Sequence, residues 1–198
     1  AEEQNETIGS EVLFGETGRY GELEYEVNED GTVTINSLNY NSSATNIEIP
    51  GEIEGKHVTS IGNYAFAGCD SLISISMPEG LRSIGDSAFS NCSNLTSISL
   101  PDSLTSIGCD AFYNTGVYKD ESSWVQGVLY IDNYLVDAKK DIEYCDVKKE
   151  CLLIGDFAFQ NCDSLTGISI PDSVTSIGYD AFYDCTSLNT IIIPDSVT

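Results

Sequence analysis

The sequence predicts an α/β solenoid in which short strands from successive turns of the chain form a parallel β-sheet. The core Ile-Gly-x-x-Ala-Phe occurs five times in the 198 residues, at intervals of 23, 23, 47 and 23. Segments such as Leu95–Pro101 precede it, and their apolar residues alternate as in a strand. A repeat period of about 20 to 50 residues is typical of stacked structures, in which each unit buries its apolar face against its neighbours.

The first part of the chain predicts a cap for this stack. Residues 1–20 are acidic and glycine-rich, which indicates a partly ordered arm. Leu23–Val27 and Thr32–Ile35 alternate on either side of Asn28–Gly31, a pattern that predicts a β-hairpin. A solenoid needs such a cap because its first turn otherwise exposes apolar side chains and unpaired strand edges. We therefore divide the chain into an arm with a hairpin cap over 1–45 and a repeat array over 46–198.

Each repeat is expected to form one rung, meaning one turn of the solenoid. Ile98 and Leu100 are two residues apart and point to one face of a strand, which Pro101 ends. Gly108 then permits a backbone angle closed to other residues, and Asp110–Phe112 suggests a single helical turn. The expected core consists of the repeated isoleucines and phenylalanines, namely Ile61, Ile84, Ile107, Ile154, Ile177, Phe66, Phe89, Phe112, Phe159 and Phe182.

The interval of 47 residues predicts an irregular insertion at about 117–150. Val128–Ile131 and Tyr134–Val136 flank a two-residue turn, so we expect a hairpin that acts as a modified rung. The insertion also contains the only tryptophan and five of the eight basic residues. Aromatic side chains dominate interface energies, and the strand faces offer mainly serine. The candidate ligand-binding residues are therefore Trp124, Tyr118, Tyr130, Tyr134, Lys139 and Lys140. The alternative is that Trp124 only fills the irregular rung.

The charge of the chain excludes several partners. With 32 acidic and 8 basic residues the net charge is −24, which repels nucleic acid and anionic membranes. No apolar run is long enough to enter a membrane as a spanning helix. Catalytic residues are not predicted, because the single histidine, His57, has no nucleophile motif and the repeated aspartates are typical of turns. We expect no enzyme activity, no cofactor and no metal.

Four cysteines occupy the same position of the repeat: Cys69, Cys92, Cys162 and Cys185. Cysteine packs as a small apolar residue, so we expect a ladder of buried free thiols. Disulfides between rungs or metal ligands are the alternatives. A bond between Cys145 and Cys151 in the insertion is a further possibility.

The repeat resembles the BspA-like (Treponema pallidum-type) leucine-rich repeats, whose units carry Ile-Pro-Asp-Ser-Val-Thr-Ser-Ile-Gly and Ala-Phe-x-x-Cys. Pro171–Phe182 matches this pattern at nearly every position, and the resemblance covers about 47–198. It implies a right-handed leucine-rich-repeat solenoid. The chain departs from the pattern at Thr115, where cysteine is expected, at Tyr118, where leucine is expected, and over 119–149.

The resemblance also implies a function and a location. Members of this family are secreted or surface proteins, often of host-associated bacteria and implicated in adhesion. We therefore expect a non-enzymatic recognition module that binds an extracellular protein or glycan, with a structural spacer as the alternative. Ala1 is consistent with a mature chain after signal-peptide removal. The apolar segment Thr190–Ile193 predicts edge-to-edge homodimers.

Overall fold

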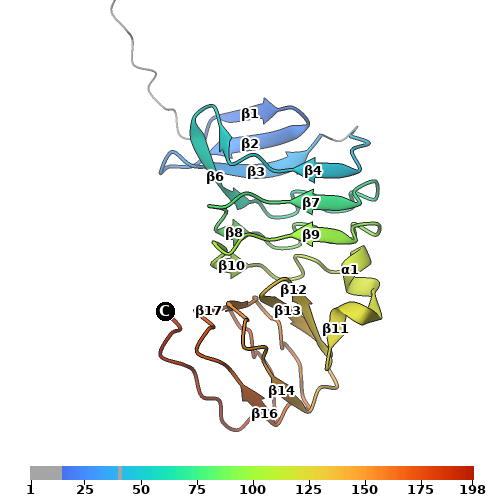
Figure 1. The fold of residues 1–198 in the computed structure, drawn as a ribbon, viewed down its shortest axis with the longest axis vertical. Coiled ribbons are helices and arrows are strands. Elements are labelled where there is room, and N and C mark those ends of the chain that lie inside the picture. The colour runs from blue at the N-terminus through green and yellow to red at the C-terminus, as the bar shows by residue number, and fades with distance from the viewer. Residues whose placement is uncertain (1–14, 40–41) are drawn as a thin grey trace, which may run out of the picture.

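The structure, a computed structural model, describes residues 15–39 and 42–198. Its rungs stack in two segments, and the stacking direction changes between them, so strands far apart in the sequence lie side by side within each segment (Figure 1). Ser60 pairs with Ser83, which in turn pairs with Ser106, and each step is 23 residues. The predicted solenoid with parallel sheets is therefore confirmed, and almost no helix accompanies it.

An antiparallel unit caps the first rung. β2 (Leu23–Val27) pairs with β1 (Thr17–Tyr20) on one side and with β3 (Val33–Leu38) on the other. β3 then pairs in parallel with β6 (Lys56–Ile61) and so begins the ladder. The predicted hairpin is thus confirmed. Part of the predicted arm is the strand β1, and residues 1–14 lie outside the described residues.

Each regular rung contributes one strand to each of two parallel sheets. Proline ends the first strand of a rung, and the Ser-Ile segment before the repeated glycine forms the second. In the first half the sheets are β4–β7–β9 (Asn46–Glu48, Ser74–Ser76, Ser97–Ser99) and β6–β8–β10 (Lys56–Ile61, Ser83–Ile84, Ser106–Ile107). β5 (Glu52–Ile53) adds a short hairpin to β6, and it accounts for the longer first repeat.

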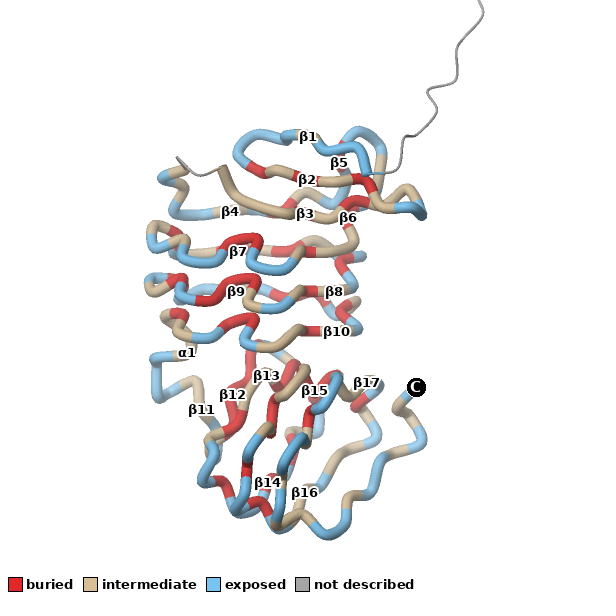
Figure 2. Tube along the Cα trace, turned by 180° about the vertical axis from the view of Figure 1, so that it is seen from behind, coloured by how far each residue is buried: buried red, intermediate tan, exposed pale blue. Residues whose placement is uncertain are grey.

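The core is a column of stacked phenylalanine rings. The ring centroids of Phe66 and Phe89 are 5.1 Å apart, and those of Phe89 and Phe112 are 5.5 Å apart. A second stack of Phe159 on Phe182, at 5.1 Å, lies beyond the irregular rung. The buried residues form two clusters that meet at this rung (Figure 2). The predicted core residues are buried except Ile177 and Phe182, which are partly exposed on the last rung.

The turn after each isoleucine differs from the expected helix. Asp110 has a φ of 54°, and a left-handed residue interrupts helical hydrogen bonding. The segment therefore consists of successive turns, with Tyr113 bonded to Asp110. The reason predicted for Gly108 is also wrong, because its φ is not positive. A Cβ atom at Gly108 would lie 2.6 Å from the amide nitrogen of Asp86, so glycine is required by close contact between rungs.

The irregular rung contains both helices of the described residues, α1 (Gly116–Lys119) and the 3-10 helix η1 (Glu121–Ser123). Three antiparallel strands follow: β11 (Trp124–Val125), β12 (Val128–Ile131) and β13 (Tyr134–Ala138). The predicted hairpin across residues 132–133 is confirmed. The array then resumes as β13–β15–β17 (Leu153–Ile154, Ser176–Ile177) and β14–β16 (Tyr144–Asp146, Gly167–Ser169).

All seven cysteines are free thiols, so the Cys145–Cys151 bond is not formed. The thiols of Cys92 and Cys185 donate to the carbonyl oxygens of Phe66 and Phe159 in the preceding rungs, at 2.9 and 3.0 Å. Of the four ladder cysteines, Cys92 and Cys162 are buried, whereas Cys69 and Cys185 are partly exposed. The repeated thiol therefore contributes a hydrogen bond as well as packing.

The last rung has no neighbour in this chain. Residues 190–193 were predicted to form a hydrophobic edge strand. They are not in a strand, and β16, the strand they would extend, pairs only with β14. Ile192 and Ile193 are 79% and 45% exposed. In the described part of the chain no helix is both long and apolar enough to span a membrane.

Candidate ligand-binding surface on the irregular rung

Thr115 starts the departure from the regular repeat. It occupies the repeated cysteine position and is fully buried. Its hydroxyl donates to the carbonyl oxygen of Phe112 at 2.9 Å and accepts from the amide of Tyr118 at 3.1 Å, which makes it the N-cap of α1. Asp120 caps η1 in the same way through the amide of Ser122. These two caps turn the chain out of the rung and place Trp124.

Three aromatic rings form a continuous row on this surface. The Trp124 and Tyr118 rings meet edge to face with centroids 5.2 Å apart, and Tyr118 and Tyr113 meet in the same way at 5.2 Å. The indole nitrogen of Trp124 donates to the carbonyl oxygen of Tyr118 at 2.8 Å. Trp124 is partly exposed, as the binding interpretation requires, but the ring that contacts it is that of Tyr118 rather than of Tyr130 or Tyr134.

Lysines line this row, and two of them are already paired. Lys139 lies over the Trp124 ring with its Nζ atom 5.4 Å from the centroid, and it donates to Glu121 at 2.6 Å. Lys140 lies 3.5 Å from a carboxylate oxygen of Asp137. Together these groups border a groove of about 350 Å³, which we call the aromatic groove. Its principal residues are Tyr113, Tyr118, Trp124, Lys119, Lys139 and Lys140.

Asp137 lies at the back of this surface. The hydroxyl of Tyr118 donates to its Oδ2 atom at 3.1 Å. Burial raises the pKa of Asp137 above the usual 3.8, although Lys140 opposes the shift. Burial likewise raises the pKa of Tyr118. The Tyr118–Asp137 contact therefore fixes the central ring of the row.

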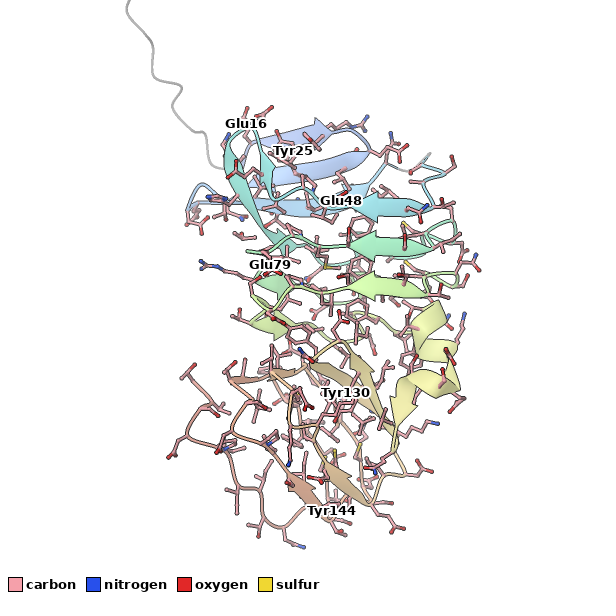
Figure 3. All side chains as sticks on the ribbon, in the orientation of Figure 1. Glu16, Tyr25, Glu48, Glu79, Tyr130 and Tyr144 are labelled. Carbon is pink, nitrogen blue, oxygen red and sulfur yellow. The ribbon has the colours of Figure 1, made fainter. Side chains whose placement is uncertain are left out.

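Two of the predicted binding residues are not on this surface. Tyr134 is fully buried, and its hydroxyl donates to the carbonyl oxygen of Pro101 at 2.6 Å. Tyr130, which Figure 3 labels, is only 8% exposed, and its hydroxyl accepts from the amide of Lys148. Both side chains join the irregular rung to its neighbours, because each finds a polar partner for its hydroxyl in the core. The prediction that they contact ligand is wrong for Tyr134 and unsupported for Tyr130.

Several residues of the groove were missed by the sequence analysis, among them Tyr113 and Glu121. Tyr113 follows the repeated Phe112 and is 46% exposed, and Glu121 lies in η1. The signal for Tyr113 is its position, because the residue after a repeated phenylalanine points outward in the turn. Glu121 could be anticipated only by expecting η1.

The groove offers contact groups but no catalytic set. His57, the single histidine, lies on β6 with its side chain 74% exposed and 3.2 Å from Glu52. Among residues 15–39 and 42–198, no three His, Cys, Asp or Glu side chains are grouped as metal ligands. What remains is a preformed aromatic row with hydrogen-bonding groups beside it, which is the composition of a recognition surface.

Comparisons with known proteins agree with the repeat and the solenoid fold. The model of the BspA type leucine rich repeat region matches six copies, over residues 32–149 and 129–198. A leucine-rich repeat protein of T. pallidum is 27% identical with a TM-score of 0.53, and the match covers 87% of this chain and 69% of that one. A leucine rich cell surface protein of Faecalibacterium prausnitzii is 25% identical with a TM-score of 0.51, covering 92% of this chain and 50% of that one. No curated protein matches the chain.

Proposed function

Because the chain belongs to the BspA-type leucine-rich-repeat family of bacterial surface proteins, we propose that it is a non-enzymatic recognition module. In this proposal it is secreted or displayed on the cell surface, and it binds an extracellular protein or glycan through the aromatic groove. The observation that carries the proposal is the row of Tyr113, Tyr118 and Trp124. Aromatic anchors of this kind supply most of the binding energy in interfaces.

The remainder of the surface supports this choice of site. The outward positions of β7, β9 and β16 are Ser74, Ser76, Ser97, Ser99, Gly167 and Ser169, which offer no large anchor, and the exposed aromatic on this face is a single tyrosine of β14, Tyr144. The groove is where the array departs from its repeat and where rings are held rigidly. A rigid ring loses little conformational entropy on binding, so more of its contact energy is retained.

The local charge favours a ligand without a large net charge. Lys139 is paired with Glu121, and Lys140 with Asp137, so these four groups cancel in an otherwise strongly acidic protein. Such pairs still present hydrogen-bond donors and acceptors beside the rings. Aromatic faces flanked by polar groups suit the apolar faces and hydroxyls of a sugar, or a tyrosine-rich protein surface.

The second candidate function is a structural spacer that holds another domain away from the cell. The uniform serine faces of β7 and β9 favour it, because a spacer needs no anchor residues. It predicts no ligand for the groove.

The test is capture of extracellular proteins and glycans on the immobilised protein, compared between the parent, Trp124→Ala and Lys119→Glu. We expect both substitutions to abolish capture while circular dichroism and urea unfolding show a folded protein. Tyr144→Ala is the matched control, because Tyr144 is 59% exposed on β14 outside the groove. Equal capture by all four proteins, or no capture by the parent, would favour the spacer.

A further inference from the structure

Regular rungs are joined along their turns by three backbone hydrogen bonds. The amides of Ser87, Phe89 and Asn91 each donate at 2.8 Å to the next rung, where the acceptors are the carbonyl oxygens of Cys109, Ala111 and Tyr113. The same three bonds, between 2.7 and 3.0 Å, join Phe157, Phe159 and Asn161 to Tyr179, Ala181 and Tyr183. Every regular turn therefore presents donors to the rung that follows and acceptors to the rung before it.

The irregular rung lacks this turn. At the position where a regular rung turns, β13 continues from Leu135 to Ala138 in order to pair with β12. The rungs before and after it consequently face each other directly, and the amide of Asp156 donates to the carbonyl oxygen of Ile107 at 2.9 Å. After that contact, the turn that follows Ile107 and the turn that follows Ile154, both of which the structure describes, form no further backbone hydrogen bonds with each other.

Six backbone groups are left without their usual partners at this point. The amides of Asp110, Phe112 and Asn114 donate to no residue in the described part of the chain. Opposite them, the carbonyl oxygens of Asp156, Ala158 and Gln160 accept from none of the described residues. Donors on one wall therefore face acceptors on the other, in the arrangement that a missing strand of chain would satisfy.

A cavity of about 170 Å³ occupies the gap, and we call it the seam cavity. Asp110 and Phe112 line one wall, Phe157 and Gln160 line the other, and Asp137 lies between them. A water molecule needs about 10–15 Å³ of such volume, so the space admits on the order of ten waters or a small organic group. Exposed Asp110, Tyr113 and Lys140 border it, so it opens to solvent.

The charge of the seam cavity selects a basic group. Three carboxylates line it, those of Asp110, Asp137 and Asp156, whereas Lys140 is the only cationic side chain of its lining. Burial raises the pKa values of Asp137 and Asp156, and for Asp137 this effect outweighs the opposing charge of Lys140, whose Nζ atom lies 3.5 Å from a carboxylate oxygen of Asp137. Phenylalanine and tyrosine rings complete the walls, and such rings also attract ammonium and guanidinium groups.

We propose that the seam cavity binds an extended peptide segment that carries a lysine or arginine side chain. The peptide carbonyls accept from the amides of Asp110 and Phe112, and its amides donate to the carbonyl oxygens of Asp156 and Gln160, all four residues being part of the cavity lining. Its basic side chain pairs with Asp137. This is strand addition, in which main-chain hydrogen bonds give affinity and a pocket for one side chain gives specificity. The site is separate from the aromatic groove, although Tyr113, Tyr118 and Lys140 border both.

The probe is the peptide acetyl-Ala-Ala-Lys-Ala-Ala-amide, and its binding is measured by isothermal titration calorimetry. Trp124 fluorescence is a second readout, because Trp124 contacts Tyr118 and Tyr118 lines the cavity. We expect saturable binding that weakens about tenfold or more when the lysine is replaced by glutamate, and also when the backbone amides are N-methylated. N-methylation keeps the charge and removes the donors, so it tests the main-chain contacts alone.

Two protein variants test the location. Asp137→Asn and Gln160→Arg should each weaken peptide binding about tenfold or more, the first by removing the carboxylate and the second by placing a cation in the cavity. Asp141→Asn is the matched control, because Asp141 is a nearby exposed carboxylate that does not line the cavity. Lys119→Glu, which tests the aromatic groove, should leave peptide binding intact. Failure of the proposed function of the groove can therefore be distinguished from failure of the peptide site in the seam cavity.

Three results would overturn the proposal: no binding of the lysine peptide, equal binding of the N-methylated or glutamate peptide, or unchanged affinity in both cavity variants. Should Asp137→Asn fail to fold, Gln160→Arg still decides the matter, because Gln160 is partly exposed on the cavity wall.

Discussion

The hydroxyl of Thr115 accepts a hydrogen bond from the amide of Tyr118, three residues further along the chain. Cysteine at the same position in a regular rung, such as Cys92, donates instead to a carbonyl oxygen of the preceding rung. One substitution in the repeat therefore exchanges a contact between rungs for a helix cap. That exchange lets the chain leave the array and form the aromatic groove.

Replacement of Thr115 tests the cap. Thr115→Ala should lower the free energy of unfolding by about 0.5–2 kcal/mol, the usual cost of losing an N-cap, and should change Trp124 fluorescence. Thr115→Ser keeps the hydroxyl and should retain both properties within error. Urea unfolding followed by fluorescence measures the two effects together. Equal stability of the alanine and serine variants would show that the cap does not position α1.

The phenylalanine column should carry much of the stability. Phe89 is fully buried between Phe66 and Phe112, so Phe89→Ala should cost about 3–5 kcal/mol through the cavity it leaves. Phe182 is partly exposed on the last rung and contacts one ring, so Phe182→Ala should cost clearly less. Urea denaturation of the two variants compares them. A parent-like midpoint for Phe89→Ala would contradict the rung model.

All seven cysteines should be titratable thiols in the denatured, unreduced protein. In the native protein Cys109 and Cys145 should react slowly at neutral pH, because burial raises their pKa values to about 11 and about 12. Cys69 should react faster, because it is partly exposed and a hydrogen bond with Cys92 lowers its pKa. Ellman titration with and without denaturant counts both states. Fewer than four thiols in the denatured protein would mean that rungs are joined by disulfides.

The raised pKa of Asp137 gives a pH dependence with a definite sign. The carboxyl of Asp137 has a pKa near 3.8 in the unfolded chain and a higher pKa in the folded protein. Protonation of Asp137 therefore favours the folded state, and this contribution to the free energy of unfolding is lost as the pH rises through the folded pKa. Asp137→Asn, which cannot ionise but keeps an acceptor for Tyr118, should therefore be more stable than the parent at pH 7. The difference should vanish below pH 3.8. Urea unfolding at pH 7 and below pH 3.8 measures this difference in stability. An Asp137→Asn variant that is less stable than the parent at pH 7 would show that the pKa of Asp137 is lowered, and not raised, by folding.

The open last rung should promote association. Ile192 is 79% exposed, and Tyr179 and Tyr183, in the turn of the last rung, are 70% and 54% exposed. β16 and β17 are the edge strands at this end of the two sheets, and exposed edges pair with another chain unless they are covered. We expect concentration-dependent dimers in light scattering, and Ile192→Lys should weaken them. A monomer at high concentration for both proteins would count against this edge.

The regular part of the fold could be predicted from sequence because the period places every isoleucine and phenylalanine. Ile84 and Phe89 must face inward if Ile61 and Phe66 do, since the same turn chemistry recurs. The hairpin over 128–138 was also predictable from local pattern, because two apolar segments flank the polar pair Asp132–Asn133. The local sequence pattern is sufficient to predict which side chains are buried where each residue packs against the equivalent residue of the next rung.

The site could be predicted only in part, because its contacts are not local. The hydroxyl of Tyr134 reaches Pro101, which is 33 residues away, and nothing near Tyr134 in the sequence indicates that it is buried. α1 was missed although Thr115 is a favourable N-cap residue, because a helix of four residues leaves little periodicity. The seam cavity was beyond prediction, since it arises from a turn that β13 does not make.

The constant offset between rungs has a consequence for how such a protein changes length. Ser83 bonds Ser60, Asn114 bonds Asn91 and Thr186 bonds Asp163, and in each pair the partners are 23 residues apart. Duplication or deletion of one 23-residue unit reconnects each side chain to an equivalent partner, so the regular segments can lengthen or shorten in whole steps. The irregular rung cannot be exchanged in this way, because Tyr134, Asp132 and Thr115 make contacts with other offsets. It acts as a fixed landmark, and the number of rungs on either side sets how far from each end of the array the aromatic groove is displayed.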